Sequence, residues 1–264
     1  MKIVVTGLTD DVSWTLFGTL YLRAWESRSE RSILRDHYAA EAVEKLDYDF
    51  AAVHRRVRPS SNQYLVALRA TRFDEWARAF LEGHPAATVL HLGCGLDSRA
   101  LRLEPPPGVR WYDVDMPEVI ALRAQLYPAS GDYHLIGTSV TDQDWLDQIP
   151  ADRPVLVVAE GLLPYLPEAE VMALLRRLTE RFPSGEMIFD VSAPWLARLI
   201  KVFRWGVRDG RVFEQWNPRL TCVDQVSFGA GYAKLPAGFY RRLYQLGDAI
   251  PVWRNMFRIY RLRW

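Results

Sequence analysis

Five short apolar runs mark the middle of the chain, and each is rich in branched or aromatic residues. They are Thr88–Leu92, Val109–Val114, Tyr133–Ile136, Val155–Ala159 and Met187–Val191. Near-continuous apolar runs of this length are typical of strands that are covered on both faces in a parallel sheet. The runs therefore predict five buried parallel strands.

Helical patterns fill the gaps between these runs. They are Ser98–Leu103, Pro117–Leu126, Asp142–Gln148 and Pro167–Phe182. The last of them places its leucines on one stripe, and Pro167 suits a first helical turn. Strands that alternate with helices in this way predict a doubly wound α/β sheet with right-handed crossovers.

A helical layer precedes the first of these strands. Residues 12–82 repeat apolar positions at roughly the helical period, first at Leu16, Leu20 and Ala24. The last helical segment is expected to run from Ser61 to Leu81, after a break at residues 59–62.

The regular alternation is lost beyond Val191. Residues 193–218 are rich in tryptophan and phenylalanine and contain two glycines, and we interpret them as an inserted cap. Two candidate strands, Leu220–Phe228 and Asn255–Arg263, raise the expected number of sheet strands to seven. We expect a single domain over residues 1–264, with a helical layer at 1–86, a cofactor-binding core at 87–192, the cap at 193–218, and closing strands with a variable segment at 219–264.

Composition and charge limit the class of partner. Thirty-three basic and 32 acidic residues give a formal net charge of +1, whereas nucleic acids and anionic membranes attract clustered excess positive charge. We therefore expect neither as a partner.

The two cysteines and five histidines lack metal-ligand spacing, so no metal site is expected. Since the chain has neither a leader-like start nor an apolar run of about 18 residues, we expect a soluble, cytoplasmic protein; no pattern indicates its oligomeric state.

Candidate chemistry begins at the end of the first buried strand, where Gly93-Cys94-Gly95 leads into a helix. A glycine-rich turn at a helix N-terminus lets backbone approach a ligand closely and is a common cradle for a nucleotide-like cofactor. A dinucleotide fingerprint would continue with a third glycine or alanine, but Ser98 stands there, directly after Asp97. Because Asp97 would repel a pyrophosphate, the turn favours S-adenosylmethionine over a nicotinamide dinucleotide.

Two further strand ends carry carboxylates. Asp113 and Asp115 follow Gly95 by about twenty residues and point the same way, so either can accept hydrogen bonds from ribose hydroxyls. Capping the helix that begins at Pro117 is the alternative role for one of them. Glu160 follows the fourth strand. Because the carboxyl ends of parallel strands meet at one crevice, Glu160 is expected near the charged methionine end of the cofactor; otherwise it is a simple loop carboxylate.

Taken in this order, the motifs resemble those of the leucine carboxyl methyltransferase and polyketide O-methyltransferase family. The resemblance covers about residues 12–190 and rests on Leu68–Asp74, Leu92–Arg99, Asp113–Pro117 and Ala159–Leu166. It implies a class I S-adenosylmethionine-dependent methyltransferase. The implied fold is a Rossmann-like, mostly parallel seven-stranded sheet with helices before it and a cap after the fifth strand.

The resemblance also implies which residues bind the cofactor. Arg69 would pair with the methionine carboxylate, for which a guanidinium fork is suited. Asp115 would hold the ribose hydroxyls, Glu160 would line the methionine end, and a looser match makes Arg23 a second basic contact. The full set is Arg23, Arg69, Gly93, Cys94, Gly95, Asp115, Met116, Ser139, Val140, Glu160 and Gly161.

Two stretches depart from the family's pattern. Where the family has Asp-Leu-Arg-Asp, whose first pair touches adenine, this chain has Ser139-Val140-Thr141-Asp142. Ser139 can still hydrogen-bond an adenine edge, but it brings no charge and reaches less far. The second arginine of the family's Leu-Arg-Thr-Arg run falls on Thr71, with Arg72 one position later.

The expected reaction is methyl transfer to oxygen, in which the protein mainly aligns donor and acceptor. A carboxylate is already ionised at pH 7, and no obvious base stands near the motifs. We therefore assign no catalytic residue and favour carboxyl methylation of a small molecule, such as a secondary metabolite or polyketide. The aromatic residues of 193–218 and Phe239–Arg242 suit a flat or hydrophobic acid, although such clusters more often form core than pocket.

Three other functions stay open at this point. The first is methylation of a phenol or hydroxyl, which would gain more from a general base than a carboxylate would. The other two belong to different classes: a nicotinamide-dependent oxidoreductase, which Asp97 and Ser98 disfavour, and a non-catalytic cofactor-binding protein.

Overall fold

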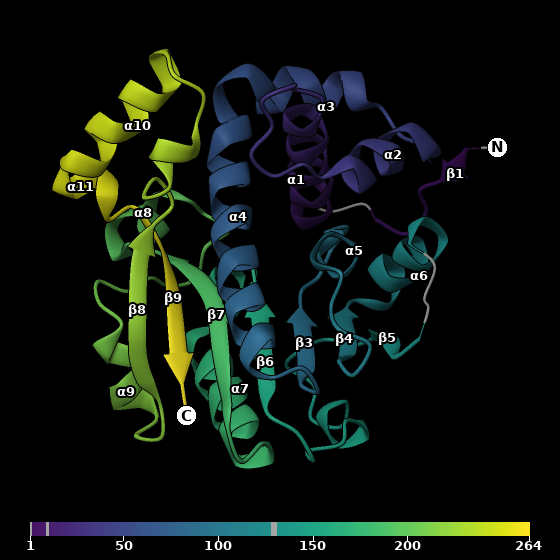
Figure 1. Cartoon of the computed structure of the whole chain (residues 1–264), viewed down its shortest axis with the longest axis vertical. Helices are drawn as coiled ribbons and strands as arrows, with labels where there is room; N and C mark the ends of the chain where they lie inside the picture. The colour runs from purple at the N-terminus through teal and green to yellow at the C-terminus, as the bar shows by residue number, and fades with distance from the viewer. Residues whose placement is uncertain (1, 9–10, 128–130) are drawn as a thin grey trace.

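A seven-stranded sheet runs through the centre of the computed structural model, which describes residues 2–8, 11–127 and 131–264 (Figure 1). The strand order is β5-β4-β3-β6-β7-β9-β8. The first five strands in this order are parallel to one another, whereas β9 is antiparallel to both β7 and β8. The predicted α/β fold with a mostly parallel seven-stranded sheet is confirmed.

The strands of this sheet match the seven apolar segments of the sequence. They are β3 (Thr88–Leu92), β4 (Arg110–Asp115), β5 (Tyr133–Gly137), β6 (Val155–Ala159), β7 (Gly185–Ser192), β8 (Thr221–Ser227) and β9 (Phe257–Arg263). A separate parallel pair joins β1 (Ile3–Val4) to β2 (Leu46–Asp47). Its strands have two residues each, too few to show a strand pattern in the sequence.

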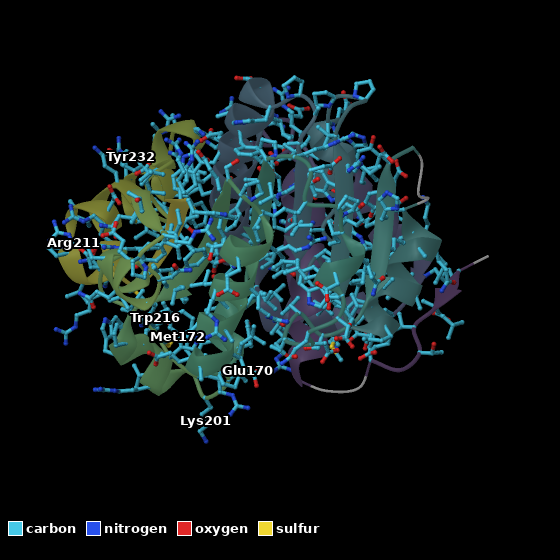
Figure 2. All side chains as sticks on the ribbon, turned by 90° about the horizontal axis from the view of Figure 1, so that it is seen from below. Glu170, Met172, Lys201, Arg211, Trp216 and Tyr232 are labelled. Carbon is cyan, nitrogen blue, oxygen red and sulfur yellow. The ribbon has the colours of Figure 1, made fainter. Side chains whose placement is uncertain are left out.

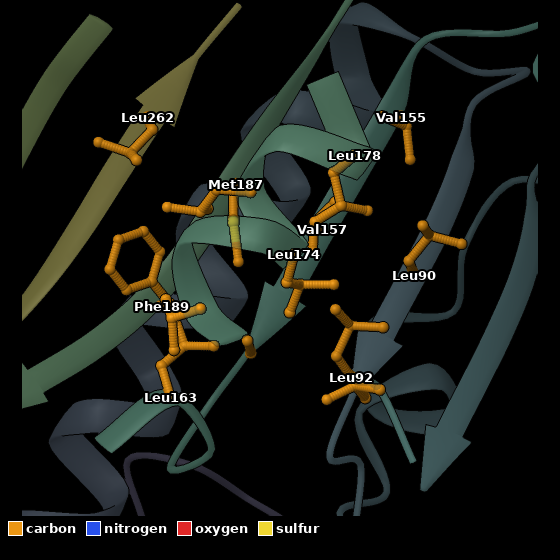
Figure 3. Close-up of a cluster of buried hydrophobic side chains, with 14 of the residues drawn as sticks. Leu90, Leu92, Val155, Val157, Leu163, Leu174, Leu178, Met187, Phe189 and Leu262 are labelled. Atoms are coloured by element: carbon orange, nitrogen blue, oxygen red, sulfur yellow. The ribbon is translucent and has the colours of Figure 1, made fainter. Parts of the chain in front are cut away.

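Helices cover both faces of the sheet, with α4 (Pro59–Gly83) on one side and α7 (Glu168–Arg181) on the other (Figure 1). On β6, Val155 and Val157 pack with leucines of α7 in one buried cluster (Figure 3). The alternate residues Leu156 and Val158 pack with aromatic residues of α4 in another. Because both faces are buried, successive side chains are all apolar, which explains why the strands appear as continuous runs.

The N-terminal layer is formed by α1 (Asp11–Ser27), α2 (His37–Lys45), α3 (Phe50–Val57) and α4. Asp36 caps α2 and Asp49 caps α3, each through a side-chain oxygen that accepts a backbone N–H three residues later. The break predicted at residues 59–62 is wrong, because α4 already begins at Pro59. The chain instead turns at Arg58, whose φ of 47° ends α3.

The helix predicted at Asp142–Gln148 is also wrong, apart from a final 3₁₀ turn at Leu146–Gln148 (η1). Asp142 Oδ2 accepts a hydrogen bond from Thr138 Oγ1 at 2.8 Å. The Val140 carbonyl accepts one from Trp145 Nε1 at 3.2 Å. Such side-chain bonds give the backbone an alternative to a helix. The other helices between strands are α5 (Arg99–Leu103) and α6 (Pro117–Leu126), as expected.

Residues 193–218 follow β7 and contain α8 (Pro194–Leu199) and α9 (Arg211–Trp216). Trp205 and Phe213 belong to the same buried cluster as the leucines of α7. These two aromatic rings are therefore part of the core. Lys201 and Arg211, from the same segment, are exposed and project outward (Figure 2).

The variable segment between β8 and β9 forms a short 3₁₀ turn at Tyr232–Lys234 (η3), then α10 (Phe239–Ala249) and α11 (Pro251–Arg254). Another 3₁₀ turn, Leu163–Tyr165 (η2), follows β6. In Figure 1, α10 stands beside the first turns of α4, and α11 lies farther out at the left edge of the molecule, next to α10. Among the described residues, none of the helices combines the length and apolar character needed to cross a membrane.

Candidate active site

A cavity of about 240 Å³ opens at the carboxyl ends of β3, β4 and β6, where the strand order reverses. Ligands of open α/β sheets bind at such switch points. Nine of the eleven residues predicted to bind the cofactor line this cavity: Arg23, Arg69, Gly93, Cys94, Gly95, Asp115, Met116, Glu160 and Gly161. Helix α1 adds Leu16 and Thr19 to the wall. We call this space the cofactor cavity.

Ser139 and Val140 do not line the cofactor cavity. Val140 is buried in the core, and its carbonyl accepts hydrogen bonds from Trp145 and Arg177. Ser139 is half-buried, with its Oγ 2.7 Å from Thr141 Oγ1. The structure thus separates these two residues from the other nine, and their contact with adenine stays a prediction.

The glycine turn leaves β3 with a backbone conformation that glycine adopts most easily. Gly93 has a φ of 58° and Gly95 a φ of 51°, both in the left-handed region. The Gly93 N–H donates to the Val114 carbonyl at 2.8 Å and ties the turn to β4. A Cβ on Gly93 would lie 2.9 Å from Leu162 Cδ1. Burial raises the pKa of the intervening Cys94 thiol well above its usual value, so the turn presents a thiol and no thiolate.

Asp115 and Asp113 have different environments, although both side chains project from β4. Asp115 lines the cofactor cavity, where it accepts the backbone N–H groups of Gly95 at 2.7 Å and Met116 at 2.8 Å. Asp113 is fully buried and accepts hydrogen bonds from Trp111 Nε1 at 2.8 Å and Arg123 Nε at 2.6 Å. Of the two carboxylates that the sequence left open, only Asp115 reaches the cavity.

We expect the fold to become less stable in acid, because protonation of Asp113 removes a stabilising contribution. Burial alone would raise its pKa, but Arg123, His91 and Tyr133 lower it to about 2 from 3.8. Its carboxylate therefore stabilises the fold above pH 3.8, by about 2 kcal/mol at pH 7, and this contribution is lost as the pH falls through about 2. In urea unfolding, Asp113→Asn should be less stable than wild type by about this amount at pH 7 and by roughly half of it at pH 3. An equal difference at both pH values would contradict the assignment.

Arg69 is held between two carboxylates at the wall. Its Nε lies 2.8 Å from Glu160 Oε1, and its Nη1 lies 3.5 Å from Asp190 Oδ2. Asp190 Oδ1 also accepts the Gly161 N–H at 2.7 Å. Burial and the nearby Glu160 raise the pKa of Asp190 to about 6 despite Arg69. Asp190 was not among the residues predicted at the site, although an acidic residue near the end of an apolar strand is a usable signal.

A buried cluster of ion pairs extends from Glu160 into the helical layer. Arg99 Nε lies 2.9 Å from Asp74 Oδ1, its Nη2 lies 3.2 Å from Asp97 Oδ2, and it also pairs with Glu160. Arg102 lies 2.7 Å from Asp74. Although burial would raise the pKa of Asp97, Arg99 and Arg102 hold it well below its usual value. Asp97 is therefore ionised at the cavity wall, and its negative charge would repel a pyrophosphate there.

The same cluster reaches α1 and α2. Arg102 lies 2.9 Å from Asp36, and Arg23 Nε lies 3.5 Å from the same carboxylate. Arg23 also donates from Nη2 to the Leu96 carbonyl at 3.2 Å. Asp36 was not predicted as part of the site, because its partner Arg102 lies 66 positions away and no spacing along the chain indicates the pair.

Comparison with known proteins identifies the family. The family model described as leucine carboxyl methyltransferase matches residues 17–179, more than half of the chain. The chain belongs to the leucine carboxyl methyltransferase family. It is 45% identical over 224 residues to the tetracenomycin polyketide synthesis O-methyltransferase TcmP of Streptomyces glaucescens, across 81% of this chain and 82% of that protein.

Two further similarities support this family assignment and the fold. Over 275 aligned residues the chain is 36% identical to the S-adenosyl-L-methionine-dependent methyltransferase dpfgK of Gibberella zeae, across 92% of this chain and 91% of that protein. The crystal structure of a putative methyltransferase from Thermobifida fusca YX has a TM-score of 0.61 at 14% identity, covering 92% of this chain and 93% of that one. At this identity the similarity shows the fold alone.

This member of the leucine carboxyl methyltransferase family is an S-adenosylmethionine-dependent methyltransferase. The predicted enzyme class and cofactor are confirmed. The two alternatives from other classes, a nicotinamide-dependent oxidoreductase and a non-catalytic binding protein, are not supported.

Proposed function

We propose that this enzyme transfers a methyl group from S-adenosylmethionine to a carboxylate oxygen of a small molecule. The observation that carries the proposal is that the proton acceptors around the methionine end of the cavity are already bound. His91 contacts Asp113 Oδ1 through Nδ1 at 3.1 Å and Arg99 Nη1 through Nε2 at 3.4 Å, so both ring nitrogens have partners. Asp97 and Glu160 are paired with arginines. A carboxylate acceptor is ionised at pH 7 and needs no base from this wall, whereas a phenol would gain from one.

The residues of the cofactor cavity suit the proposed binding mode. Asp115 would accept the ribose hydroxyls, and the backbone of Gly93 and Gly95 would lie against the ligand. Arg69 and Glu160 offer opposite charges to the carboxylate and amino groups of the methionine part. The bound cofactor supplies a methyl group activated by a positively charged sulfur. The chain's own part is to orient the ligands and exclude water.

The charge of the buried cluster supports a cationic ligand. The cluster holds one more carboxylate than guanidinium, its members being Asp36, Asp74, Asp97, Glu160 and Asp190 against Arg23, Arg69, Arg99 and Arg102. S-adenosylmethionine carries a net positive charge at neutral pH. A fixed negative excess beside the cavity therefore favours its binding.

The name of one relative supports oxygen as the accepting atom. The protein from Streptomyces glaucescens is named an O-methyltransferase of polyketide synthesis, which favours a small molecule as the substrate of this chain. In this proposal residues 1–264 act as one domain, with the cofactor held by residues 87–192 and covered by the segments on either side.

The test separates carboxyl methylation from phenol methylation. The enzyme is incubated with methyl-labelled S-adenosylmethionine and matched pairs of aromatic acids and phenols, such as 2-naphthoate and 2-naphthol, and products are then treated with mild alkali. A methyl ester releases volatile labelled methanol, whereas an aryl methyl ether is stable. We expect alkali-labile product from the acids. Label transferred only to phenols, in alkali-stable form, would overturn the carboxylate assignment.

A further inference from the structure

A second cavity, of about 430 Å³, lies between α4, the loop after β8, and the helices α10 and α11. We call it the apolar cavity. Aliphatic and aromatic side chains form most of its wall, among them Leu65, Phe228, Leu243, Tyr244, Trp253 and Phe257. Small-molecule sites are typically apolar spaces of roughly 300–1,000 Å³ with a few polar groups. The apolar cavity has this size and character.

The apolar cavity adjoins the cofactor cavity along one stripe of α4. Ser61 and Leu65 line the apolar cavity, and Arg69 lines the cofactor cavity. Residues spaced by four lie on the same face of a helix, and four residues rise by about 6 Å. The guanidinium of Arg69 also lies 5.4 Å from the ring centroid of Phe228, a wall residue of the apolar cavity.

A row of aromatic rings joins the two cavities by a second route. Tyr165, in the wall of the cofactor cavity, has its ring centroid 5.2 Å from that of Phe203. Phe203 is followed by Phe257 at 6.3 Å, and Phe257 stacks on Phe228 at 5.1 Å. A flat ring system that reached from one cavity to the other would meet aromatic faces and edges along its length.

The wall of the apolar cavity exposes apolar surface that a ligand would cover. Trp253 is 50% exposed and Leu243 is 37% exposed, and none of the residues of α10 is buried. Burying such surface is favourable. Polar groups are few: Ser227 Oγ donates to Asp248 Oδ1 at 2.6 Å, which leaves the second carboxylate oxygen of Asp248 for a hydroxyl donor on a ligand.

We propose that the apolar cavity binds the flat aromatic body of the methyl acceptor, with the acid group directed toward Tyr165 at the wall of the cofactor cavity. The inference rests on the proposed function, because it assigns a place and a shape to the acceptor of that reaction. The acceptor is then a fused-ring aromatic carboxylic acid. The row from Tyr165 to Phe228 and the stripe of α4 set its path between the cavities.

The test uses anthraquinone-2-carboxylate as a flat aromatic acid and measures its binding by calorimetry in the presence of S-adenosylhomocysteine. Ser61→Trp places an indole in the apolar cavity from an exposed position of α4, and Ser60→Trp makes the same change at an exposed neighbour outside the cavity wall. We expect Ser61→Trp to weaken binding of the probe at least tenfold and Ser60→Trp to leave it within twofold of wild type.

A second matched pair of substitutions lies on α10, so the test does not depend only on changes in the first turn of α4. Leu243→Glu puts a carboxylate into the apolar cavity, whereas Leu246→Glu puts one at a 57% exposed position of the same helix that does not line it. Only Leu243→Glu should weaken binding of the anionic probe. Equal binding by the two variants of each pair, or no binding to the wild type, would overturn the inference.

Binding of S-adenosylhomocysteine and methylation of the acids are measured in the same variants, so that a failure of this inference can be told apart from a failure of the proposed function. None of the four substitutions touches the wall of the cofactor cavity, so the dissociation constant of S-adenosylhomocysteine should stay within twofold in all of them. If the probe binds as expected but no acid is methylated, the proposed carboxyl methylation fails while the aromatic site stands. If acids are methylated but the matched pairs do not differ, the acceptor lies elsewhere.

Discussion

Replacing Arg99 with alanine is expected to lower the free energy of unfolding by about 3–5 kcal/mol, the cost of removing one partner of a buried ion pair. Arg99 is fully buried, and it neutralises Asp74, Asp97 and Glu160. Without the guanidinium, these carboxylates lose a counter-charge in a place that water does not reach. The expected loss is a large part of the stability of an ordinary domain.

Urea unfolding at pH 7 measures this loss, with Arg28→Ala as the control. Arg28 is 46% exposed and lies 3.9 Å from the exposed Glu44, and exposed pairs contribute only about 0–1 kcal/mol. A variant Arg99→Ala that unfolded within about 1 kcal/mol of wild type would mean that the buried cluster relaxes or that water enters it.

Replacing Asp115 with alanine is expected to weaken the binding of S-adenosylhomocysteine by about 10- to 100-fold. The carboxylate sits at the end of β4 with both oxygens oriented by backbone N–H groups of Gly95 and Met116. Hydrogen bonds to a charged group contribute about 1.5–3 kcal/mol, and each 1.4 kcal/mol is about tenfold in affinity. The substitution also frees the Gly95 N–H and so loosens the turn that the cofactor would meet.

Calorimetry with S-adenosylhomocysteine gives the dissociation constants for this comparison. Asp152→Ala is the matched control, because Asp152 is 53% exposed and pairs with Arg110, at the start of β4. Its affinity should equal that of wild type. Should Asp115→Ala bind as tightly as Asp152→Ala, the ribose contact would have to be assigned to another residue.

The sequence predicted the sheet well because burial on both faces leaves a strong local pattern. β3, β6 and α6 have the expected bounds. The failures also have local causes. Residues 142–148 contain hydrogen-bonding side chains that compete with a helix. The break before α4 was expected one residue too late, because the turn falls on the left-handed Arg58 and Pro59 already stands in the first turn of the helix. Helix α10 repeats Phe239, Leu243 and Leu246 at helical spacing, a pattern that was available but not used.

The site was predictable only in part, for a different reason. Gly93, Asp115 and Glu160 follow strand ends, so the topology of the sheet alone brings them together. The second partner of Arg69, Asp190, depends on which way a side chain points at one position of a buried strand. The pairs of Arg99 and Arg102 join segments that are 25 or more residues apart, apart from those with Asp97. Such pairing is a property of packing, which spacing along the chain does not encode.

The ion pairs between α5 and the helical layer have a consequence for how this protein can change by recombination. Asp36 and Asp74 come from segments that precede the sheet, yet they neutralise Arg99 and Arg102, which follow the glycine turn. A chimera that joined the first 86 residues of a distant relative to this sheet would bury unmatched charges unless it carried the same acids. A stable chimera therefore needs both parts from parents that share these acids and arginines, so this cluster limits where a crossover can fall.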